Sequence, residues 1–367
     1  MRRRSKPVFG VACHWGVRLW AVTASTLFFA VTAAQAAPQT EMAYFIGNSV
    51  TDTIGYTALE QMIEARGHQH IWGRHTIPGA PLEYTWNNPF VGNAENQQAG
   101  SGGQPGYTDA LPNYTWNAIV LQPYDHRAST DYTYTSAFIN LATQNPANAD
   151  AQVYLMSRWP RRTSDGAGDF LPFDFRTLWD AQYAGIDNSP NDTENRDYFQ
   201  ELVGILTDPL ATTDPGTIDD TPLELLPGDD HPSALLNKPI LLIPVGDVMY
   251  ELENRLRSDP GSSLSLYGID AVEDLYADGV HLNDMGRFVV GTVVAATLYK
   301  ESPVGLPSSP YANGSPFNPD FVTLVQTTTW DVVKGHPYSG VPLPEPGTLA
   351  LLSLGGLAIL RRRGSLG

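Results

Sequence analysis

Short apolar runs alternate with longer amphipathic stretches along the chain between residues 43 and 299. The apolar runs predict strands over 43–47, 70–75, 118–122, 152–157 and 239–245. The stretch 54–66 predicts a helix because Leu59, Met62 and Ile63 recur at the spacing of one helix face, and a longer helix is expected over 284–299. This alternation is typical of an α/β domain with a central parallel sheet, whose active site lies at the carboxyl ends of the strands.

Three stretches depart from this alternation. Residues 87–113 are rich in Asn, Gln and Gly, and residues 187–237 are rich in Asp, Pro and Thr. Connections of that length are either functional loops that shape a substrate cleft or decoration of the surface. From 303 to 343 Pro, Ser, Thr and Gly become frequent and the periodicity fades, which predicts a linker. We therefore expect one main domain over 37–302.

The two ends of the chain carry patterns of export. Residues 1–36 combine a basic start, an apolar stretch and the small residues Ala34-Gln35-Ala36, which indicates a signal peptide. An uncleaved membrane anchor is the alternative. At the other end, Pro344-Glu345-Pro346 precedes an apolar run over 348–360 and the three arginines 361–363.

This last segment, 344–367, resembles the PEP-CTERM sorting signal of Gram-negative bacteria. The resemblance implies an exosortase-type processing enzyme as a partner and delivery to the cell surface or the extracellular matrix. Together with the signal peptide it implies transient membrane contact through both termini. An ordinary C-terminal membrane anchor followed by cytoplasmic arginines is the alternative that composition leaves open.

Composition narrows the choice of partners and cofactors. The chain has 22 Lys and Arg against 39 Asp and Glu, a net charge of −17, which excludes nucleic acid as a partner and favours neutral substrates. Its only cysteine, Cys13, lies in the predicted signal peptide, so the mature protein would form no disulfide. Because side chains alternate along a strand, His68 and His70 would lie on one face of a predicted strand and His75 on the other. No zinc site is therefore expected there. No nucleotide-binding glycine motif is present, and we expect no cofactor.

Two distant motifs supply the residue types of acyl-transfer chemistry. Ser49 lies in Gly47-Asn48-Ser49-Val50-Thr51-Asp52, where the first predicted strand ends, and Asp278 and His281 lie in Asp278-Gly279-Val280-His281-Leu282-Asn283. A carboxylate that orients an imidazole, and an imidazole that accepts a hydroxyl proton, turn a weak alcohol into a nucleophile. Each motif also has a plainer interpretation, since Ser49 could cap the next helix and Asp278 could form a turn with His281.

With these motifs the chain resembles the SGNH hydrolases, also called GDSL-type esterases, over most of residues 43–299. The resemblance implies a flavodoxin-like three-layer sandwich, with Ser49 as nucleophile, His281 as base and Asp278 as the group that orients His281. It also implies an oxyanion hole made by the N–H groups of Ser49 and Gly79 and by the side-chain amide of Gln122, which stands where the family has asparagine. For Gly79 an ordinary Pro-Gly turn is the alternative.

The activity implied by this resemblance is hydrolysis of carboxylic esters, without a metal or organic cofactor. O-acetyl groups on an extracellular polysaccharide are a candidate substrate. The alternative is a catalytically weak or inactive SGNH-like surface protein that binds glycan, because Gln122 departs from the family pattern. Trp159, Arg161 and Arg162 follow the fourth predicted strand at the same edge. An aromatic face there would suit a sugar ring or would simply pack.

Overall fold

The computed structural model describes residues 37–100, 106–124, 127–165, 169–185, 192–217, 220–258, 264–265 and 268–342. The predicted signal peptide, 1–36, and the predicted sorting signal, 344–367, lie outside the described residues, so both stay predictions. In the part of the chain that is described, no helix combines the length and the apolar character needed to cross a membrane.

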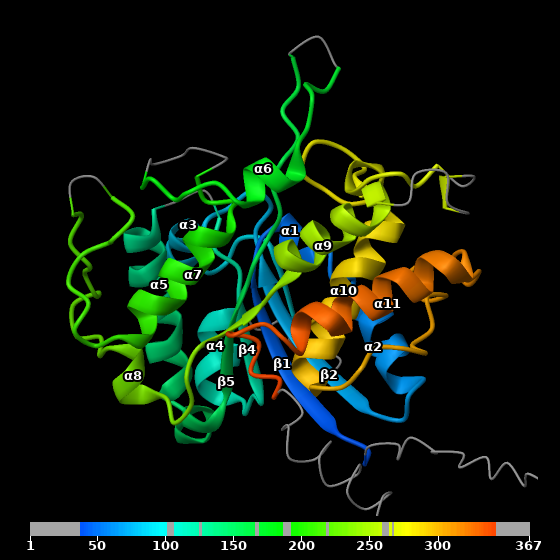
Figure 1. Cartoon of the computed structure of the whole chain (residues 1–367). Helices are drawn as coiled ribbons and strands as arrows, with labels where there is room; N and C mark the ends of the chain where they lie inside the picture. The colour runs from blue at the N-terminus through cyan, green and yellow to red at the C-terminus, as the bar shows by residue number, and fades with distance from the viewer. Residues whose placement is uncertain are drawn as a thin grey trace, which may run out of the picture. The chain divides into compact units, whose positions relative to one another are not determined.

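A six-stranded sheet in the order β3-β2-β1-β4-β5-β6 forms the centre of the domain (Figure 1). The strands are β1 (Thr40–Gly47), β2 (Gln69–Thr76), β3 (Asn93–Asn96), β4 (Ala118–Leu121), β5 (Gln152–Met156) and β6 (Leu241–Ile243). Neighbouring strands run parallel except for β2 and β3, which are antiparallel. Without the short edge strand β3, the order is that of flavodoxin-like folds, and it reverses between β1 and β4, where such sheets bind ligands. The predicted α/β class is confirmed.

Helices cover both faces of this sheet and complete three layers. They are α1 (Ser49–Asp52), α2 (Tyr56–Glu64), α3 (Leu82–Asn87), α4 (Tyr107–Asn113), α5 (Ala128–Thr143), α6 (Phe175–Trp179), α7 (Arg196–Thr207), α8 (Pro232–Leu235), α9 (Val245–Ser258), α10 (Asp284–Tyr299) and α11 (Pro319–Val333). Helices α3, α4, α5 and α7 lie on one side and α2, α9, α10 and α11 on the other (Figure 1). Every residue of β4 and β5 is buried between these layers, which explains their apolar sequences.

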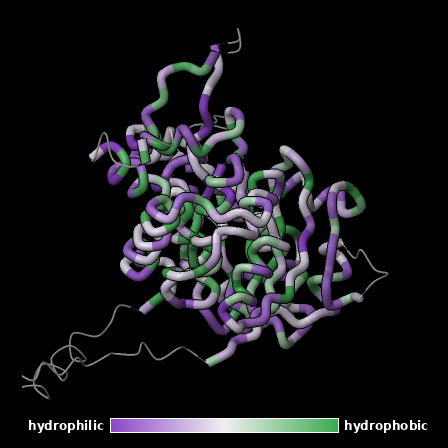
Figure 2. Tube along the Cα trace, turned by 90° about the vertical axis from the view of Figure 1, so that its right-hand side faces the viewer, coloured by the Kyte–Doolittle hydropathy of each residue, from purple (hydrophilic) through white to green (hydrophobic). Residues whose placement is uncertain are grey.

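Hydrophobic residues gather in the middle of the domain, while hydrophilic ones lie mainly on its outer loops (Figure 2). The buried set includes the apolar positions of α2 that the periodicity indicated, Leu59, Met62 and Ile63. It also includes nearly all of α10, which lies beneath α11 and next to α9. Burial on several sides is the reason why α10 is apolar around most of its circumference.

The stretch predicted to be a linker, 303–343, belongs to the domain over its described part. Helix α11 packs against α9 and α10, and its side chains Phe321, Val325 and Val333 are fully buried. Beyond the helix, the carbonyl of Tyr338 accepts a hydrogen bond of 2.8 Å from the N–H of Leu242 in edge strand β6. The linker prediction is wrong because threonines occupy part of the buried face of α11, so the apolar pattern is weak.

The two long connections are also partly regular. Residues 87–113 contain β3 and α4, and residues 187–237 contain α7, which packs on α5. Asn195 caps helix α7, since its side chain accepts from the N–H of Tyr198. The helix buries one face, which includes Phe199, Leu202 and Leu206. Strand β3 escaped prediction because its sequence, Asn93-Ala94-Glu95-Asn96, has no apolar run.

Candidate active site

Ser49 stands at the exit of β1 as the first residue of the one-turn helix α1. Asn48 caps this turn: its side-chain oxygen accepts from the N–H of Val50 at 2.9 Å, and its side-chain nitrogen donates to the carbonyl of Ala80 at 3.0 Å. Gly47 is required before it, because a Cβ there would lie 2.0 Å from the Thr51 hydroxyl oxygen. The capping role that the sequence allowed for Ser49 is therefore filled by Asn48, which leaves the serine hydroxyl for other contacts.

The structure brings Ser49, His281 and Asp278 into one hydrogen-bonded chain. His281 Nε2 lies 2.8 Å from Ser49 Oγ, and His281 Nδ1 lies 2.7 Å from Asp278 Oδ2. Ser49 and His281 are 232 positions apart in the sequence. They meet because β1 and the loop before α10 end at the same rim of the sheet.

Asp278 also shapes the loop that carries the histidine. Its Oδ1 accepts from the backbone N–H groups of Val280 and His281, both at 2.7 Å, and Asn283 caps the helix that follows. Partial burial raises the pKa of the Asp278 carboxyl, but these two N–H groups and the His281 ring outweigh it, and the net pKa is lowered. Asp278 thus serves as a turn former and as the partner of His281 at once.

The candidate triad lies at an open rim. The side chains of Asp278 and His281 are 56% and 46% exposed. Such exposure admits a bulky substrate but leaves the Asp278–His281 contact open to competition by water.

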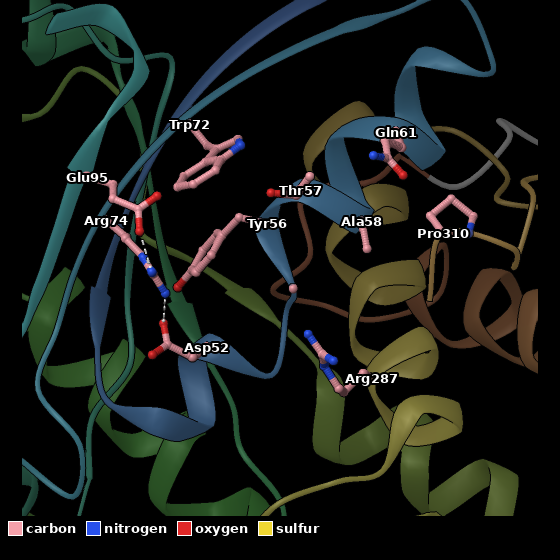
Figure 3. A pocket seen from close by; sticks show the side chains of 11 residues that line it. Asp52, Tyr56, Thr57, Ala58, Gln61, Trp72, Arg74, Glu95, Arg287 and Pro310 are labelled. Carbon is pink, nitrogen blue, oxygen red and sulfur yellow. Dashed lines mark hydrogen bonds and ion pairs between the residues drawn. The ribbon is translucent and has the colours of Figure 1, made fainter. Parts of the chain in front are cut away.

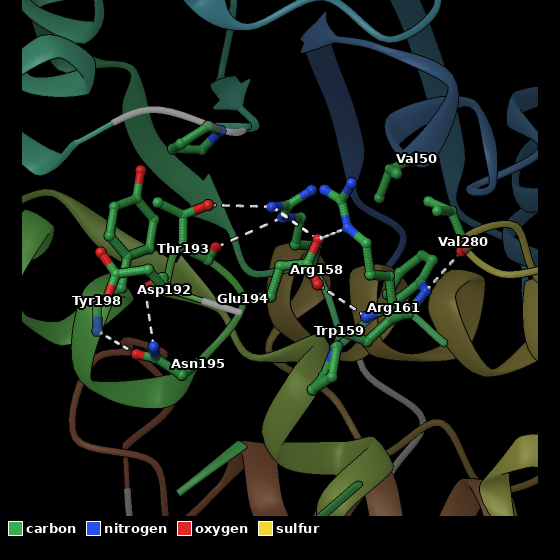
Figure 4. Close-up of polar contacts among 12 residues, drawn as sticks. Val50, Arg158, Trp159, Arg161, Asp192, Thr193, Glu194, Asn195, Tyr198 and Val280 are labelled. Carbon is green, nitrogen blue, oxygen red and sulfur yellow. Dashed lines mark hydrogen bonds and ion pairs between the residues drawn. The ribbon is translucent and has the colours of Figure 1, made fainter. Parts of the chain in front are cut away.

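A loop that follows β5 supports the loop that carries His281 through hydrogen bonds (Figure 4). The indole N–H of Trp159 donates to the carbonyl of Val280 at 2.9 Å, and the N–H of Arg162 donates to the carbonyl of Gly279 at 2.7 Å. The Tyr276 hydroxyl donates to the carbonyl of Pro160 at 2.7 Å. The sequence placed Trp159 and Arg162 at this edge, but it gave no sign that they hold the loop of His281.

Buried ion pairs anchor this supporting loop in turn (Figure 4). Glu194 accepts from Arg158 at 2.9 Å and from the Arg161 side chain at 2.5 Å, and its second oxygen accepts from the Arg161 N–H at 2.8 Å. The side chains of Arg158 and Glu194 are each 1% exposed, and the Arg158 guanidinium lies 4.1 Å from the centre of the Tyr124 ring. Sequence reasoning missed Glu194, since it lies in the long connection 187–237 with no motif around it.

Two backbone N–H groups are available beside Ser49. Gly79 occupies a tight turn with φ of +70°, in which the N–H of Ala80 donates to the carbonyl of Ile77 at 3.0 Å. The Asn48–Ala80 hydrogen bond fixes this turn against the nucleophile loop. Among the described residues, neither the N–H of Ser49 nor the N–H of Gly79 donates a hydrogen bond to another group. Both stay the predicted donors of an oxyanion hole.

Gln122 does not take up the predicted position. Its side chain is fully buried, its oxygen accepts from the Thr51 hydroxyl at 3.2 Å, and its nitrogen donates to the carbonyl of Pro123. The amide thus braces the end of β4 against the nucleophile loop from inside. This geometry contradicts the oxyanion role predicted for Gln122, because the longer side chain turns inward at the point where an asparagine would reach outward.

The histidines of β2 lie as the alternation predicted. His70 Nδ1 is 3.1 Å from the Tyr299 hydroxyl, while His75 lies on the other face, where its Nδ1 accepts from the N–H of Tyr107. Within the described ranges, no group of three or more His, Asp, Glu or Cys side chains is arranged to hold a metal ion.

Comparisons with known proteins add two similar structures. No protein-family model matches the chain, and no curated protein is significantly similar to it in sequence. A DUF4886 family protein from Bacteroides uniformis ATCC 8492 is 15% identical with a TM-score of 0.48, over 84% of this chain and 99% of that one. A protein from Slackia heliotrinireducens, provisionally named an SGNH hydrolase, is 16% identical with a TM-score of 0.34, over 70% of this chain and 97% of that one.

Proposed function

We propose that the chain is an exported serine esterase or deacylase in which Ser49 attacks the carbonyl carbon of a carboxylic ester. The observation that carries this proposal is the continuous chain of contacts from Asp278 through His281 to Ser49, at 2.7 and 2.8 Å. A histidine that donates from Nδ1 to a carboxylate has its free lone pair on Nε2, which here faces the serine hydroxyl. This contact supports the proposed role of His281 as the base that accepts the Ser49 proton.

The reaction then follows from the geometry. As Ser49 Oγ bonds to the carbonyl carbon, its proton passes to His281 Nε2, and negative charge develops on the carbonyl oxygen. The N–H groups of Ser49 and Gly79 stabilise that oxyanion, and a donor of this kind contributes about 10²–10³-fold in rate. His281 next protonates the departing alcohol. Water attacks the acyl-enzyme, gives its proton to His281, and the carboxylic acid leaves as Ser49 recovers its proton.

An O-acetyl group on an extracellular polysaccharide is the substrate that we favour. The open rim suits an ester carried on a bulky polymer, and the net charge of −17 suits a polymer that is not anionic. The predicted signal peptide and PEP-CTERM segment would bring the protein to the cell surface or matrix, where such polymers occur, after processing by an exosortase-type enzyme.

Hydrolysis of p-nitrophenyl acetate tests the proposal. The unmodified protein should turn over this ester, while Ser49→Ala should not, and a fluorophosphonate probe should label Ser49 alone. Ser233→Ala is a matched control, because the Ser233 hydroxyl also lies 2.8 Å from a histidine, His231, but serves in a helix cap. Equal rates for the unmodified protein and Ser49→Ala, with no labelling of Ser49, would disprove the esterase.

One observation favours a second candidate, an SGNH-like surface protein that binds glycan with little or no turnover. With Gln122 turned inward, the proposed oxyanion hole has two donors, the N–H groups of Ser49 and Gly79, rather than three. That candidate predicts binding of polysaccharide without release of acetate, which a direct acetate assay distinguishes from the esterase.

A further inference from the structure

A cavity of about 430 Å³ is lined by residues that include Asp52, Tyr56, Arg74 and Arg287 (Figure 3). Its volume lies within the roughly 300–1,000 Å³ of small-molecule sites. The segments that carry the triad continue directly into its walls: Asp52 and Tyr56 follow Ser49, and Arg287 follows His281 in the first turn of α10. Arg74 of β2 and Glu95 of β3 lie beside Asp52, on the side of the cavity away from Arg287 (Figure 3). A ligand in the cavity would therefore contact the same two segments that carry Ser49 and His281.

The walls present hydrogen-bonding groups of both kinds. Arg74 donates to Asp52 at 2.8 Å and to Glu95, and Asp52 also accepts from the Thr76 hydroxyl at 3.0 Å. These contacts fix both carboxylates and one guanidinium in place before any ligand arrives. Arg287 makes a longer contact of 3.4 Å with Asp284, and its side chain is 40% exposed.

An aromatic pair lies behind these polar groups. The rings of Tyr56 and Trp72 stack with centroids 5.0 Å apart and planes 24° apart, and the Arg74 guanidinium lies 5.1 Å from the centre of the Tyr56 ring. Both aromatic residues are buried, at 5% and 6% exposure, so they support the polar wall rather than offer a free stacking face. The surface that a ligand meets is thus polar and rigid.

The charge of the lining selects the class of ligand. Two carboxylates, Asp52 and Glu95, balance two guanidinium groups, Arg74 and Arg287, so the cavity favours neither anions nor cations. Charged groups at the entrance would lose hydration against an acyl chain, which argues against a fatty ester. A neutral molecule with many hydroxyl groups can both donate to the carboxylates and accept from the guanidinium groups.

We propose that this cavity is a subsite for a neutral saccharide unit of the polymer whose ester is presented to Ser49. The assignment rests on the proposed function and extends it to the recognition of the alcohol part of the substrate. Ser49 and Asp52 belong to the same one-turn helix, so the proposal places the saccharide unit in the cavity and the ester that it carries at Ser49.

Two substitutions test the subsite, because they should change the kinetics with a polysaccharide substrate and not with a small ester. Arg287→Gln and Gln61→Ala both change exposed side chains of the lining, and Gln61 is a surface position whose loss leaves the core intact. Each should raise KM for acetate release from acetylated xylan or glucomannan by about tenfold, as expected for a lost hydrogen bond to a charged or amide group. Neither should change the kinetics with p-nitrophenyl acetate, which is too small to fill the cavity. Arg176→Gln is the matched control, since Arg176 is 44% exposed and pairs with Asp174 at 3.8 Å outside the cavity.

Binding by the Ser49→Ala protein tests the cavity apart from catalysis. Titration calorimetry with xylan, glucomannan and dextran oligosaccharides should detect binding of at least one, weakened about tenfold by Arg287→Gln. Alginate, an acidic polysaccharide, should bind more weakly than the best neutral one. Absence of binding to every neutral oligosaccharide, tighter binding of alginate, or an unchanged KM in both variants would overturn the subsite even if p-nitrophenyl acetate is hydrolysed. Binding without any hydrolysis would instead support the subsite and disprove the esterase.

Discussion

Replacing Asp278 by asparagine separates the two roles of this carboxylate. An asparagine keeps the side-chain oxygen that accepts from the N–H groups of Val280 and His281, so the loop retains its shape. It places an NH2 group, in place of a carboxylate oxygen, against His281 Nδ1. The imidazole then has to accept at Nδ1 and carry its proton on Nε2, where it can no longer accept the Ser49 proton.

The size of the effect follows from the exposure of the pair. Where such a carboxylate is buried, the same change lowers kcat on the order of 10⁴-fold. The Asp278 side chain is 56% exposed, so water can take its place at Nδ1 and restore part of the productive tautomer. We therefore expect a loss of about 10²–10³-fold in kcat, or about 2.7–4.1 kcal/mol of activation free energy.

The assay is steady-state hydrolysis of p-nitrophenyl acetate, with KM expected to stay near the unmodified value because the binding surface is unchanged. Asp331→Asn is the control for a lost surface carboxylate, since Asp331 pairs with Lys334 and Arg255 on the outer helix α11. Circular dichroism should show that both variants are folded. A folded Asp278→Asn protein with a kcat within about threefold of the unmodified enzyme would refute the proposed role of the carboxylate.

Three further predictions concern the supports of the site and the fold. Trp159→Phe removes the hydrogen bond to the Val280 carbonyl and should lower kcat about tenfold while KM for p-nitrophenyl acetate stays constant; a change in KM alone would contradict this positioning role. Burial lowers the pKa of His70 from 6.5 to about 4, so the unfolded chain takes up a proton first as the pH falls. Between pH 7 and pH 4 the free energy of unfolding of the unmodified protein should therefore decrease by about 3 kcal/mol more than that of His70→Gln. Urea denaturation measures both, and an equal decrease in the two proteins would contradict the prediction. Phe321→Ala should lower the free energy of unfolding, measured by urea denaturation, by about 3–5 kcal/mol because the side chain of Phe321 on α11 is fully buried, whereas a loss below about 1 kcal/mol would mean that this helix unfolds separately.

Much of the fold could be predicted because its central strands are apolar on both faces. The five parallel strands and α10 were predicted from apolar runs such as Ala118–Leu121. These runs are apolar because their residues are buried, which excludes most polar side chains. Among the elements that escaped prediction, β3 and α11 bury polar side chains or use few apolar ones. Hydrophobic periodicity reports burial only where burial excludes polar groups, and two of the buried positions of α11 are threonines, Thr328 and Thr329.

The candidate site was predictable to the extent that its chemistry lies within short motifs. The candidates Ser49, Asp278 and His281 came from the resemblance of two short motifs to those of the SGNH hydrolases, since the residue types alone also allowed a helix cap and a turn. The inward turn of Gln122 could not be foreseen, because it depends on the Thr51 hydroxyl and the Pro123 carbonyl meeting the amide inside the protein. Glu194 is likewise defined only by the two arginines that fold onto it from another segment.

The hydrogen bond between Leu242 and Tyr338 bears on how the chain can be shortened. Strand β6 is the outermost parallel strand, and its sequence, Leu241-Leu242-Ile243, is wholly apolar. An uncovered strand of this kind offers unpaired backbone groups to other chains and is a template for aggregation. Ending a recombinant protein at residue 302, where composition alone would place the domain boundary, would strip this cover from the sheet. Tags and truncations belong after residue 342, so that the segment around Tyr338 continues to cover edge strand β6.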